Sequence, residues 1–529
     1  MFNKFNPIIK FPDYLLEWKD KIEKVAIDSG LSFFPVIFEM VDFDTLYQVA
    51  AKSGFPERYP HWHFGQEYDH LYKQHKYGVM RISEMVINTD PVYAYLMNSN
   101  NLIDQKLVIA HVYGHADFFK NNLWFANTDR KMLDIIGSHT RIIKDYIDEY
   151  GEREVEEFLD ICLSLETLVD KHSLFIQRKT KLKRTGLFEK KKSSKELQSQ
   201  SDLISVSPDR FYMNEFVNPK DELKKQRDIR EKKRIQEEEK DKDIGNKDIL
   251  YFLIKRAPIR SWQKHILSMV REEAYYFAPQ VMTRTMNEGW ASFWHSNILA
   301  TKRMCEDNEL IDYAAHHSAT MGSSKSLNPY KLGYEIFKDI EERWNKGRFG
   351  KEYEDCKDLV VKEKWDTKAM LGIQKIFEVR KLYNDIGFID EFFTPELCKK
   401  LKLYDYEKQN DEYVITDREF QTIKQRLLFS LSNHGFPTLT VSEIDNKGSL
   451  FLKHNTESEF IFNIDDAKEV TTNIQKLWKK PVSLTIENNK VTHIYTNTSG
   501  ENTVLSTFKK EQEDSHKNYD DDEEHFTHP

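Results

Sequence analysis

The sequence has few cysteines and no long apolar run. Its 529 residues include four cysteines, which stand far apart at Cys162, Cys305, Cys356 and Cys398. This dispersion excludes a disulfide framework and the close cysteine pairs of zinc-binding modules. No stretch of about 18 uncharged apolar residues occurs, so no membrane-spanning helix is expected. These absences favour a protein that works with reduced thiols.

A secretory signal and an excess of positive charge are also lacking. Met1 to Lys10 contains no apolar core followed by small residues. The net charge of −9 gives no general attraction to nucleic acid or to anionic membranes. The sequence has no glycine-rich phosphate loop and no motif for a Ser or Cys nucleophile. We therefore expect a cytoplasmic protein that does not bind nucleic acid.

Apolar residues are present in sufficient number for a large core, at 39% hydrophobic and 13% aromatic. Apolar residues recur at helical spacing from Phe11 to about Leu401, which predicts a mainly α, multi-helix N-terminal domain over residues 1–400. Alternating apolar residues and Asn- or Gly-containing turns follow. They predict a smaller α+β C-terminal domain over residues 412–509.

Two charged segments interrupt this pattern. Residues 177–247 are rich in Lys, Arg, Glu and Asp and poor in apolar residues. We interpret them as a flexible insert, because they offer little apolar surface to offset chain entropy. A basic docking patch for nucleic acid is the alternative, but acidic residues follow the basic ones immediately. Residues 510–529 are expected to form a disordered acidic tail.

Two local predictions concern the surroundings of the candidate site. The stretch Pro60 to Gly65 is bounded by Pro and Gly, which favours an extended segment with His61 and His63 on the same side. A strongly helical pattern covers Ser261 to Ala278, and Pro279 is expected to end that helix.

The strongest candidate site is an apolar helix predicted over Leu102 to Asn121. It carries His111 and His115, and a spacing of four residues places both imidazoles on one face. Gly114 lies between them at a cost of about 1 kcal/mol against Ala, which suggests that another segment approaches closely there. We expect the helix that contains Glu288 to face this pair.

These residues predict one divalent transition metal bound by His111, His115 and Glu288, most simply zinc, with water as the fourth ligand. Glu288 resembles the third ligand of zinc peptidases that take a carboxylate from a later helix. The usual catalytic glutamate of a His-Glu-x-x-His helix is absent, because Val112 occupies its position. Two histidines hydrogen-bonded within the core remain the alternative to a metal site.

Further residues are candidates for catalytic roles. His295 lies seven residues after Glu288, about 10 Å along a helix, so we assign it to support of a ligand or to substrate binding. Glu272 and Glu273 are candidates for acid/base catalysis, with surface salt bridges as the alternative. Four other histidines either complete the site, bind an anionic substrate or are structural: His61, His63, His316 and His317.

Several long segments resemble the SpoVR family, the group of stage V sporulation protein R. They are Pro60-His61-Trp62 with Phe64-Gly65, Ala110-His111-Val112-Tyr113-Gly114-His115, Arg271-Glu272-Glu273-Ala274-Tyr275-Tyr276, Asn287-Glu288-Gly289-Trp290-Ala291-Ser292, Leu327-Asn328-Pro329-Tyr330-Lys331-Leu332-Gly333 and Ile340-Glu341-Glu342-Arg343-Trp344. The resemblance covers nearly the whole chain outside the charged insert and the tail. His63 departs from the family pattern, which argues against a general catalytic role for it.

The resemblance implies a cytoplasmic protein involved in formation of the spore cortex, the peptidoglycan layer of the endospore. Relatives in bacteria that do not sporulate are often encoded beside a PrkA-like serine kinase, which implies a wider role in stress. The resemblance implies no particular reaction. Two hypotheses therefore stay open: a metal-dependent hydrolase that acts on a cell-wall precursor or peptide amide, and a non-enzymatic assembly or regulatory protein.

Overall fold

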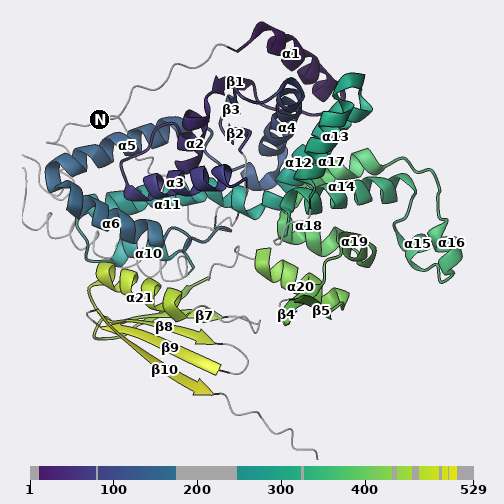
Figure 1. The fold of residues 1–529 in the computed structure, drawn as a ribbon. Coiled ribbons are helices and arrows are strands. Elements are labelled where there is room, and N and C mark those ends of the chain that lie inside the picture. Colours follow the sequence, from purple (N-terminus) through teal and green to yellow (C-terminus); the bar gives the residue numbers. More distant parts are fainter. Residues whose placement is uncertain are drawn as a thin grey trace, which may run out of the picture.

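The computed structural model describes residues 11–78, 82–173, 175, 247–322, 327–409, 412–431, 438–455, 464–487, 491–498 and 500–508. Helices dominate the N-terminal and central parts of the described chain, and a five-stranded sheet lies near the C-terminus (Figure 1). The predicted fold class, mainly α with a smaller α+β C-terminal part, is confirmed. The predicted insert (apart from Lys247) and the predicted acidic tail lie outside the described residues.

Helices make up most of the described body. The first nine are α1 (Asp13–Asp28), α2 (Phe43–Ala51), α3 (Trp62–Lys76), α4 (Leu102–Asn121), α5 (Met132–Tyr150), α6 (Glu152–Ser164), α10 (Ile249–Arg256), α11 (Ser261–Met282) and α12 (Arg284–Ser296). They are followed by α13 (Leu310–Thr320), α14 (Pro329–Asn345), α15 (Lys351–Glu354), α16 (Leu359–Glu363), α17 (Gly372–Leu382), α18 (Asp385–Phe392), α19 (Pro395–Leu401) and α20 (Phe420–Leu431).

Helix α4 runs through the centre of the body. The side chain of Asn101 caps its first turn by accepting a hydrogen bond from the backbone N–H of Asp104. Every residue from Ile103 to Phe119 is buried, including polar ones such as Lys106 and Asp117, so the helix is enclosed on all sides. Such a helix can form only where other elements surround it, so its stability depends on its neighbours.

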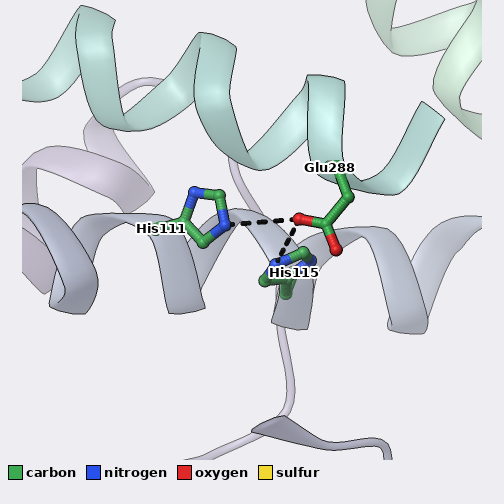
Figure 2. Close-up of side chains that lie close together, drawn as sticks. All are labelled: His111, His115 and Glu288. Carbon is green, nitrogen blue, oxygen red and sulfur yellow. Dashed lines mark ion pairs between the residues drawn. The ribbon is translucent and has the colours of Figure 1, made fainter. Parts of the chain in front are cut away.

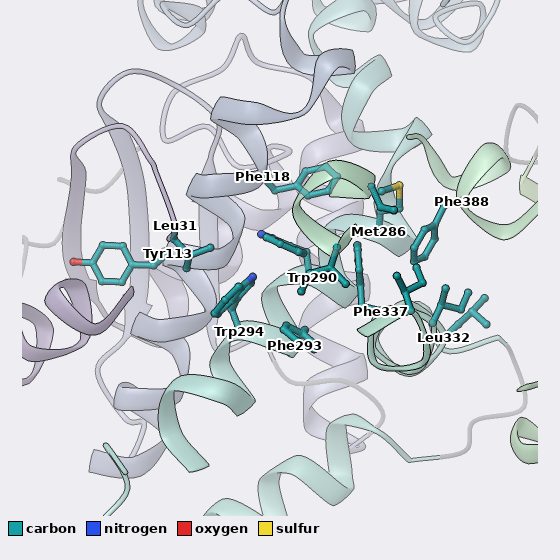
Figure 3. Packing of buried hydrophobic residues seen from close by; sticks show 14 of the residues in the cluster. Leu31, Tyr113, Phe118, Met286, Trp290, Phe293, Trp294, Leu332, Phe337 and Phe388 are labelled. Carbon is teal, nitrogen blue, oxygen red and sulfur yellow. The ribbon is translucent and has the colours of Figure 1, made fainter. Parts of the chain in front are cut away.

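The main hydrophobic cluster surrounds α4 and α12 (Figure 3). Trp290 and Trp294 of α12 lie at its centre, with ring centroids 5.6 Å apart, and Phe337 of α14 packs edge-on against Trp290. Buried aromatic rings of this size contribute roughly 1.5–3 kcal/mol each. Asp385 anchors the start of α12, because its carboxylate accepts hydrogen bonds from two backbone N–H groups there, at 2.8 Å each. The start of α12 is thereby tied to α18.

A small three-stranded sheet lies against the N-terminal helices. It contains β1 (Val36–Val41), β2 (Glu84–Ile87) and β3 (Val92–Met97) in the order β1-β3-β2, with β1 and β3 parallel and β2 antiparallel to β3. Contacts between β2 and α4 place Glu84, the first residue of β2, near the middle of α4.

The C-terminal part is a sheet with one helix. The strands β6 (Thr440–Ile444), β7 (Leu450–Asn455), β8 (Val482–Glu487), β9 (Val491–Thr498) and β10 (Glu501–Phe508) have the order β10-β9-β8-β7-β6. Helix α21 (Ile464–Trp478) connects the parallel pair β7 and β8. Its Trp478 stacks on Phe252 of α10, and one hydrophobic cluster includes residues of the sheet, α21, α6, α10 and α11. This sheet is therefore packed on the helical body.

The segment before this sheet packs elsewhere. The hairpin of β4 (Asp405–Gln409) and β5 (Glu412–Asp417) forms a separate two-stranded sheet, and Ile423 of α20 belongs to the cluster around α12. The domain division at residue 412 stays a prediction, although the packing groups α20 with the helical body.

Two local predictions are wrong. The stretch Pro60 to Gly65 is not extended: His61 caps α3, which begins at Trp62, by accepting a hydrogen bond from the backbone N–H of His63. Helix capping by a polar side chain outweighs the extended preference of a Pro-bounded segment. Helix α11 also continues through Pro279 to Met282: Ala278 and Pro279 are buried, and the Pro279 carbonyl accepts a hydrogen bond from the Thr283 hydroxyl. No helix among the described residues is long and apolar enough to cross a membrane.

Candidate metal centre

Helix α4 presents its two histidines together. His111 and His115 are 3% and 7% exposed, and their rings meet edge to face with centroids 4.5 Å apart. Two imidazoles on successive turns of a buried helix each require a partner for both ring nitrogens. The predicted placement of the pair on one helix face is confirmed.

A close approach between helices brings the third residue to this pair. A Cβ atom at Gly114 would lie 2.7 Å from the Cα of Ala291, so only glycine allows α12 to pack at this distance from α4. Ala291 lies one turn after Glu288, and the Glu288 side chain reaches toward both imidazoles (Figure 2). The approach that the sequence predicted at Gly114 is therefore confirmed, and α12 is the segment that makes it.

The three donor atoms converge. The Oε2 atom of Glu288 lies 3.6 Å from Nε2 of His111 and 3.5 Å from Nε2 of His115 (Figure 2). These distances are too long for hydrogen bonds, and this buried Oε2 has no hydrogen-bond partner in the described part of the chain. Ligands about 2.0–2.1 Å from a tetrahedral zinc ion lie roughly 3.3–3.5 Å from each other. The two distances to Oε2 thus nearly match the spacing of ligands around one ion, and the three residues offer ligand atoms within 4.8 Å of one another.

The Nδ1 atom of each imidazole also has a partner within hydrogen-bond distance. Nδ1 of His111 lies 3.0 Å from Nδ1 of His295, and Nδ1 of His115 lies 2.9 Å from Oδ1 of Asn287. Because the Asn287 oxygen can only accept, His115 carries its proton on Nδ1 and directs the lone pair of Nε2 toward Glu288. Such outer contacts orient the histidine ligands of metal sites.

His295 thus lies behind His111, at the site where a group supporting a ligand would lie. It is 1% exposed, and burial, followed by the charge of His111, lowers the pKa of its imidazole well below the usual value. A neutral His295 can accept the Nδ1 proton of His111, which leaves Nε2 of His111 available to a metal. Its catalytic role remains a prediction.

Electrostatics favour the ionised carboxylate at Glu288. Burial raises its pKa, but the adjacent imidazoles of His115 and His111 outweigh this effect and bring the pKa far below the usual value. For His115, burial lowers the pKa, and Glu288 outweighs burial and raises it. The cluster therefore holds a carboxylate ready to bind a cation.

Two residues that the sequence did not single out complete the surroundings. Oε1 of Glu84 lies 4.0 Å from Nε2 of His111, and the ring of Tyr330 stacks on His111 at 6.2 Å. The charges of Glu288 and Glu84, together with burial, raise the pKa of the Tyr330 hydroxyl well above its usual value. Glu84 is the lone acidic residue of a short strand, so no spacing rule connects it with α4.

Tyr330 reaches the site through a second close helix contact. A Cβ atom at Gly289 would overlap the backbone of Gly333, so α12 and α14 pack against each other at glycine on both sides. Tyr330 lies in the first turn of α14, just before this contact. The Leu327 to Gly333 segment, noted for its resemblance, therefore positions a hydroxyl at the site.

Glu272 and Glu273 belong to a different cluster. His139 of α5 lies between them: its Nδ1 is 3.0 Å from Oε1 of Glu273, and its Nε2 is 3.4 Å from Oε2 of Glu272. Glu273 also forms a buried ion pair with Arg58. Burial lowers the pKa of His139, but the hydrogen bonds to both glutamates raise it to about 9 overall. The catalytic roles of Glu272 and Glu273 stay predictions, and their contacts are with this cluster.

The remaining candidate histidines are dispersed. Nε2 of His61 lies 3.1 Å from Asp160, and Nδ1 of His316 lies 3.0 Å from Asp104. The ring of His317 meets that of His295 edge to face at 6.3 Å, so it is the one of the four with a ring contact to the residues around the centre. His63 is exposed at the start of α3.

Comparison with known proteins agrees with the resemblance noted in the sequence. The chain is 28% identical over 511 residues to a protein of Escherichia coli (strain K12) described as uncharacterized protein YcgB, and the alignment covers 90% of this chain and 93% of that protein. No solved structure matches the chain. The family model described as SpoVR like protein matches residues 11–436, which include α4, α12 and Glu84. The chain therefore belongs to the SpoVR family.

Proposed function

We propose that this protein is a metal-dependent hydrolase whose centre consists of His111, His115 and Glu288. The observation that carries the proposal is the buried Oε2 of Glu288, which lacks a hydrogen bond yet lies 3.5 and 3.6 Å from two imidazole nitrogens. A buried carboxylate oxygen costs free energy unless it has a partner, and a cation shared with the imidazoles supplies one.

The donor set favours zinc. Two imidazole nitrogens and one carboxylate oxygen form the ligand set of several catalytic zinc sites, which keep a fourth position for water or substrate. Iron and manganese also accept mixed nitrogen and oxygen ligands. A bound zinc ion would supply a Lewis acid and lower the pKa of a coordinated water.

The residues of this chain divide the other tasks of amide hydrolysis. Glu84 takes the role that the missing glutamate at position 112 would have: its carboxylate accepts a proton from the attacking water. The water oxygen bonds to the amide carbon, the C–N bond breaks, and the proton passes to the leaving nitrogen. The Tyr330 hydroxyl, kept protonated by its raised pKa, donates a hydrogen bond to the developing oxyanion.

The family suggests where such a hydrolase works. We propose that it acts on an amide of a cell-wall precursor during formation of the spore cortex, in the same process as a PrkA-like serine kinase. This part of the proposal is supported by family membership, and the chemistry of the site is compatible with it.

Glu84 supports a second candidate function. If its carboxylate, now 4.0 Å from Nε2 of His111, moves in to bind the metal, the centre has four protein ligands. Closed sites of this kind are structural. The protein would then be a non-enzymatic assembly or regulatory protein with a stabilising metal.

Metal analysis of protein purified without chelator tests both functions. We expect about one equivalent of metal in the unaltered protein and under about a tenth of an equivalent in His111→Ala and His115→Ala, since each variant loses a ligand. His316→Ala is the matched control, because His316 pairs with Asp104 and should leave the metal content unchanged.

The Glu84→Gln variant separates the two candidates. Retention of the metal is expected if Glu84 acts as the base, whereas a loss comparable to that of His115→Ala would establish the closed, structural site. Circular dichroism checks that each variant is folded. Metal-free protein with His111 and His115 hydrogen-bonded inside the core would refute the metal centre in both its catalytic and its structural form, and would favour a non-enzymatic protein without a metal.

A further inference from the structure

A large cavity lies away from the candidate metal centre. Its volume is about 940 Å³, within the range of small-molecule sites. Residues of α3, α6, α11 and α21 line it, together with the segments around Arg58 and Glu166, and the three proposed metal ligands are not among them. Figure 1 shows these four helices on the same side of the body, with α21 next to the C-terminal sheet.

One part of the wall is apolar. It is formed by Ile161 and Leu163 of α6 and by Phe277, Ala278 and Val281 of α11. The indole of Trp62 also borders the cavity. It is 54% exposed, and its Nε1–H donates to Oδ1 of Asp160 at 2.7 Å, which fixes the orientation of the ring. A fixed, accessible indole is a good surface for a cation or an alkyl chain.

The charges that line the cavity are mostly negative. Five carboxylates face three cationic side chains: Glu157, Asp160, Glu166, Glu273 and Glu469 against Arg58, Lys171 and Lys476. Arg58 is paired with Glu273, which also contacts His139. The negative charge of Glu273 is therefore already neutralised by protein groups. Glu157 pairs with Arg153 and Asp160 accepts from Trp62, so Glu166 and Glu469 are the carboxylates that remain for a ligand.

Glu166 is one of two cavity carboxylates, with Glu469, that have no partner among the described residues. No hydrogen bond or ion pair joins its carboxyl group to another of the residues that the structure describes, and its side chain is accessible to solvent at the cavity. Burial among protein atoms raises its pKa to about 7, opposed by Arg58 and supported by Glu273. By contrast, Glu273 and Asp160 each have donors from the protein.

We propose that this cavity binds an organic cation that carries a primary ammonium group. The ammonium pairs with Glu166, and the alkyl portion of the ligand packs against the apolar wall formed by α6 and α11. Trp62 covers the other side of the ligand. The site is independent of the candidate metal centre.

The C-terminal unit completes this site. The Nδ2 of Asn473 in α21 donates to the Oγ of Ser164 in α6 at 2.9 Å, which closes one edge of the cavity. Lys476 and Glu469 of the same helix also line it. The family match ends at residue 436, so a bound ligand would contact both the family core and the sheet unit beyond it.

Calorimetric titration with three five-carbon compounds tests the charge preference. Cadaverine carries two ammonium groups, pentane-1,5-diol is neutral, and glutarate carries two carboxylates. We expect saturable binding of cadaverine at one site and binding at least about tenfold weaker for the diol and for glutarate, because only an ammonium can pair with Glu166. Absence of cadaverine binding, or equal affinity for the diol, would overturn the proposal, and tighter binding of glutarate would show an anion site instead.

Variants locate the binding. Glu166→Gln is expected to weaken cadaverine binding at least about tenfold, whereas Glu17→Gln should not, because Glu17 lies outside the cavity lining, is 69% exposed and pairs with Lys21. Equal affinity in wild type and Glu166→Gln would place cadaverine elsewhere and refute the assignment. His115→Ala should bind cadaverine normally, so failure of the metal proposal and failure of this one are distinguishable.

Discussion

The candidate metal centre and the cluster around His139 use the same kinds of side chains and differ in how completely these are paired. In the cluster, both nitrogens of His139 contact carboxylates, and Glu273 also pairs with Arg58. At the centre, the Nδ1 atoms of His111 and His115 are held, while their Nε2 atoms face an oxygen of Glu288 that has no hydrogen bond among the described residues.

This difference separates a structural ion network from a site prepared for a ligand. In the cluster, both carboxylates and both imidazole nitrogens have partners, so a metal ion would have to displace existing contacts there. A cluster whose carboxylate oxygen lies 3.5 and 3.6 Å from two imidazole nitrogens, without a hydrogen bond, gains a direct interaction when a cation binds between them. Residue type alone would have placed both clusters in one class.

We expect the largest loss of stability when the ion pair between Arg58 and Glu273 is removed. Arg58→Met removes the guanidinium partner of the buried Glu273 carboxylate, leaves the protonated His139 as its cation, and should lower the free energy of unfolding by up to about 3–5 kcal/mol. Urea denaturation measures this, with Arg153→Met, which breaks an exposed ion pair, as a control expected to cost under about 1 kcal/mol. Similar losses in both variants would show that the two pairs contribute alike.

A smaller effect is expected when the support of a metal ligand is removed. Asn287→Leu deprives Nδ1 of His115 of its acceptor and should weaken metal binding by about 10–100-fold. Competition with a chromogenic chelator measures the affinity. The control is Ser292→Ala on the same helix, since the buried Ser292 hydroxyl has no hydrogen-bond partner in the described ranges. Unchanged affinity in Asn287→Leu would contradict the proposed orientation of His115.

The packing of α4 on α12 can be tested at its glycine. Gly114→Ala places a methyl group against Ala291 and should lower the free energy of unfolding by about 1–3 kcal/mol and weaken metal binding, because Glu288 moves away with α12. Gly137→Ala in α5 has open space around the new methyl group and should stabilise by up to about 1 kcal/mol. If Gly114→Ala changed neither the free energy of unfolding nor the metal affinity, the close packing of α4 on α12 would not be required for stability or for the metal centre.

The paired network also predicts a pH dependence. The pKa of His139 is raised from 6.5 to about 9, so the folded protein holds a proton that the unfolded chain releases. Its contribution is complete below pH 6.5 and disappears as the pH rises through 9, a loss of roughly 1–3 kcal/mol. His139→Gln should flatten the fall of unfolding free energy between pH 6.5 and 9.5, and an unchanged slope would assign that fall to other groups.

Local sequence patterns predicted what depends on helix periodicity. The pair His111 and His115 share a face because helix geometry fixes residues four apart, and Gly114 marked the point of close approach because a glycine inside a helix is unfavourable without such a contact. The predictions based on Pro60 and Pro279 were wrong. His61 caps a helix that starts at Trp62, and α11 continues through Pro279, so tertiary contacts outweighed the local preference of proline.

The sequence by itself determined the helical body, the helix with two histidines and the later glutamate that faces it. Only the tertiary structure decided that Glu84 lies at the centre, that His295 supports His111, and that Glu272 and Glu273 pair with His139 and Arg58. The reason is physical: spacing along one helix is fixed by covalent geometry, whereas contacts between distant segments depend on how glycine contacts, buried aromatics and a neighbouring strand place whole helices.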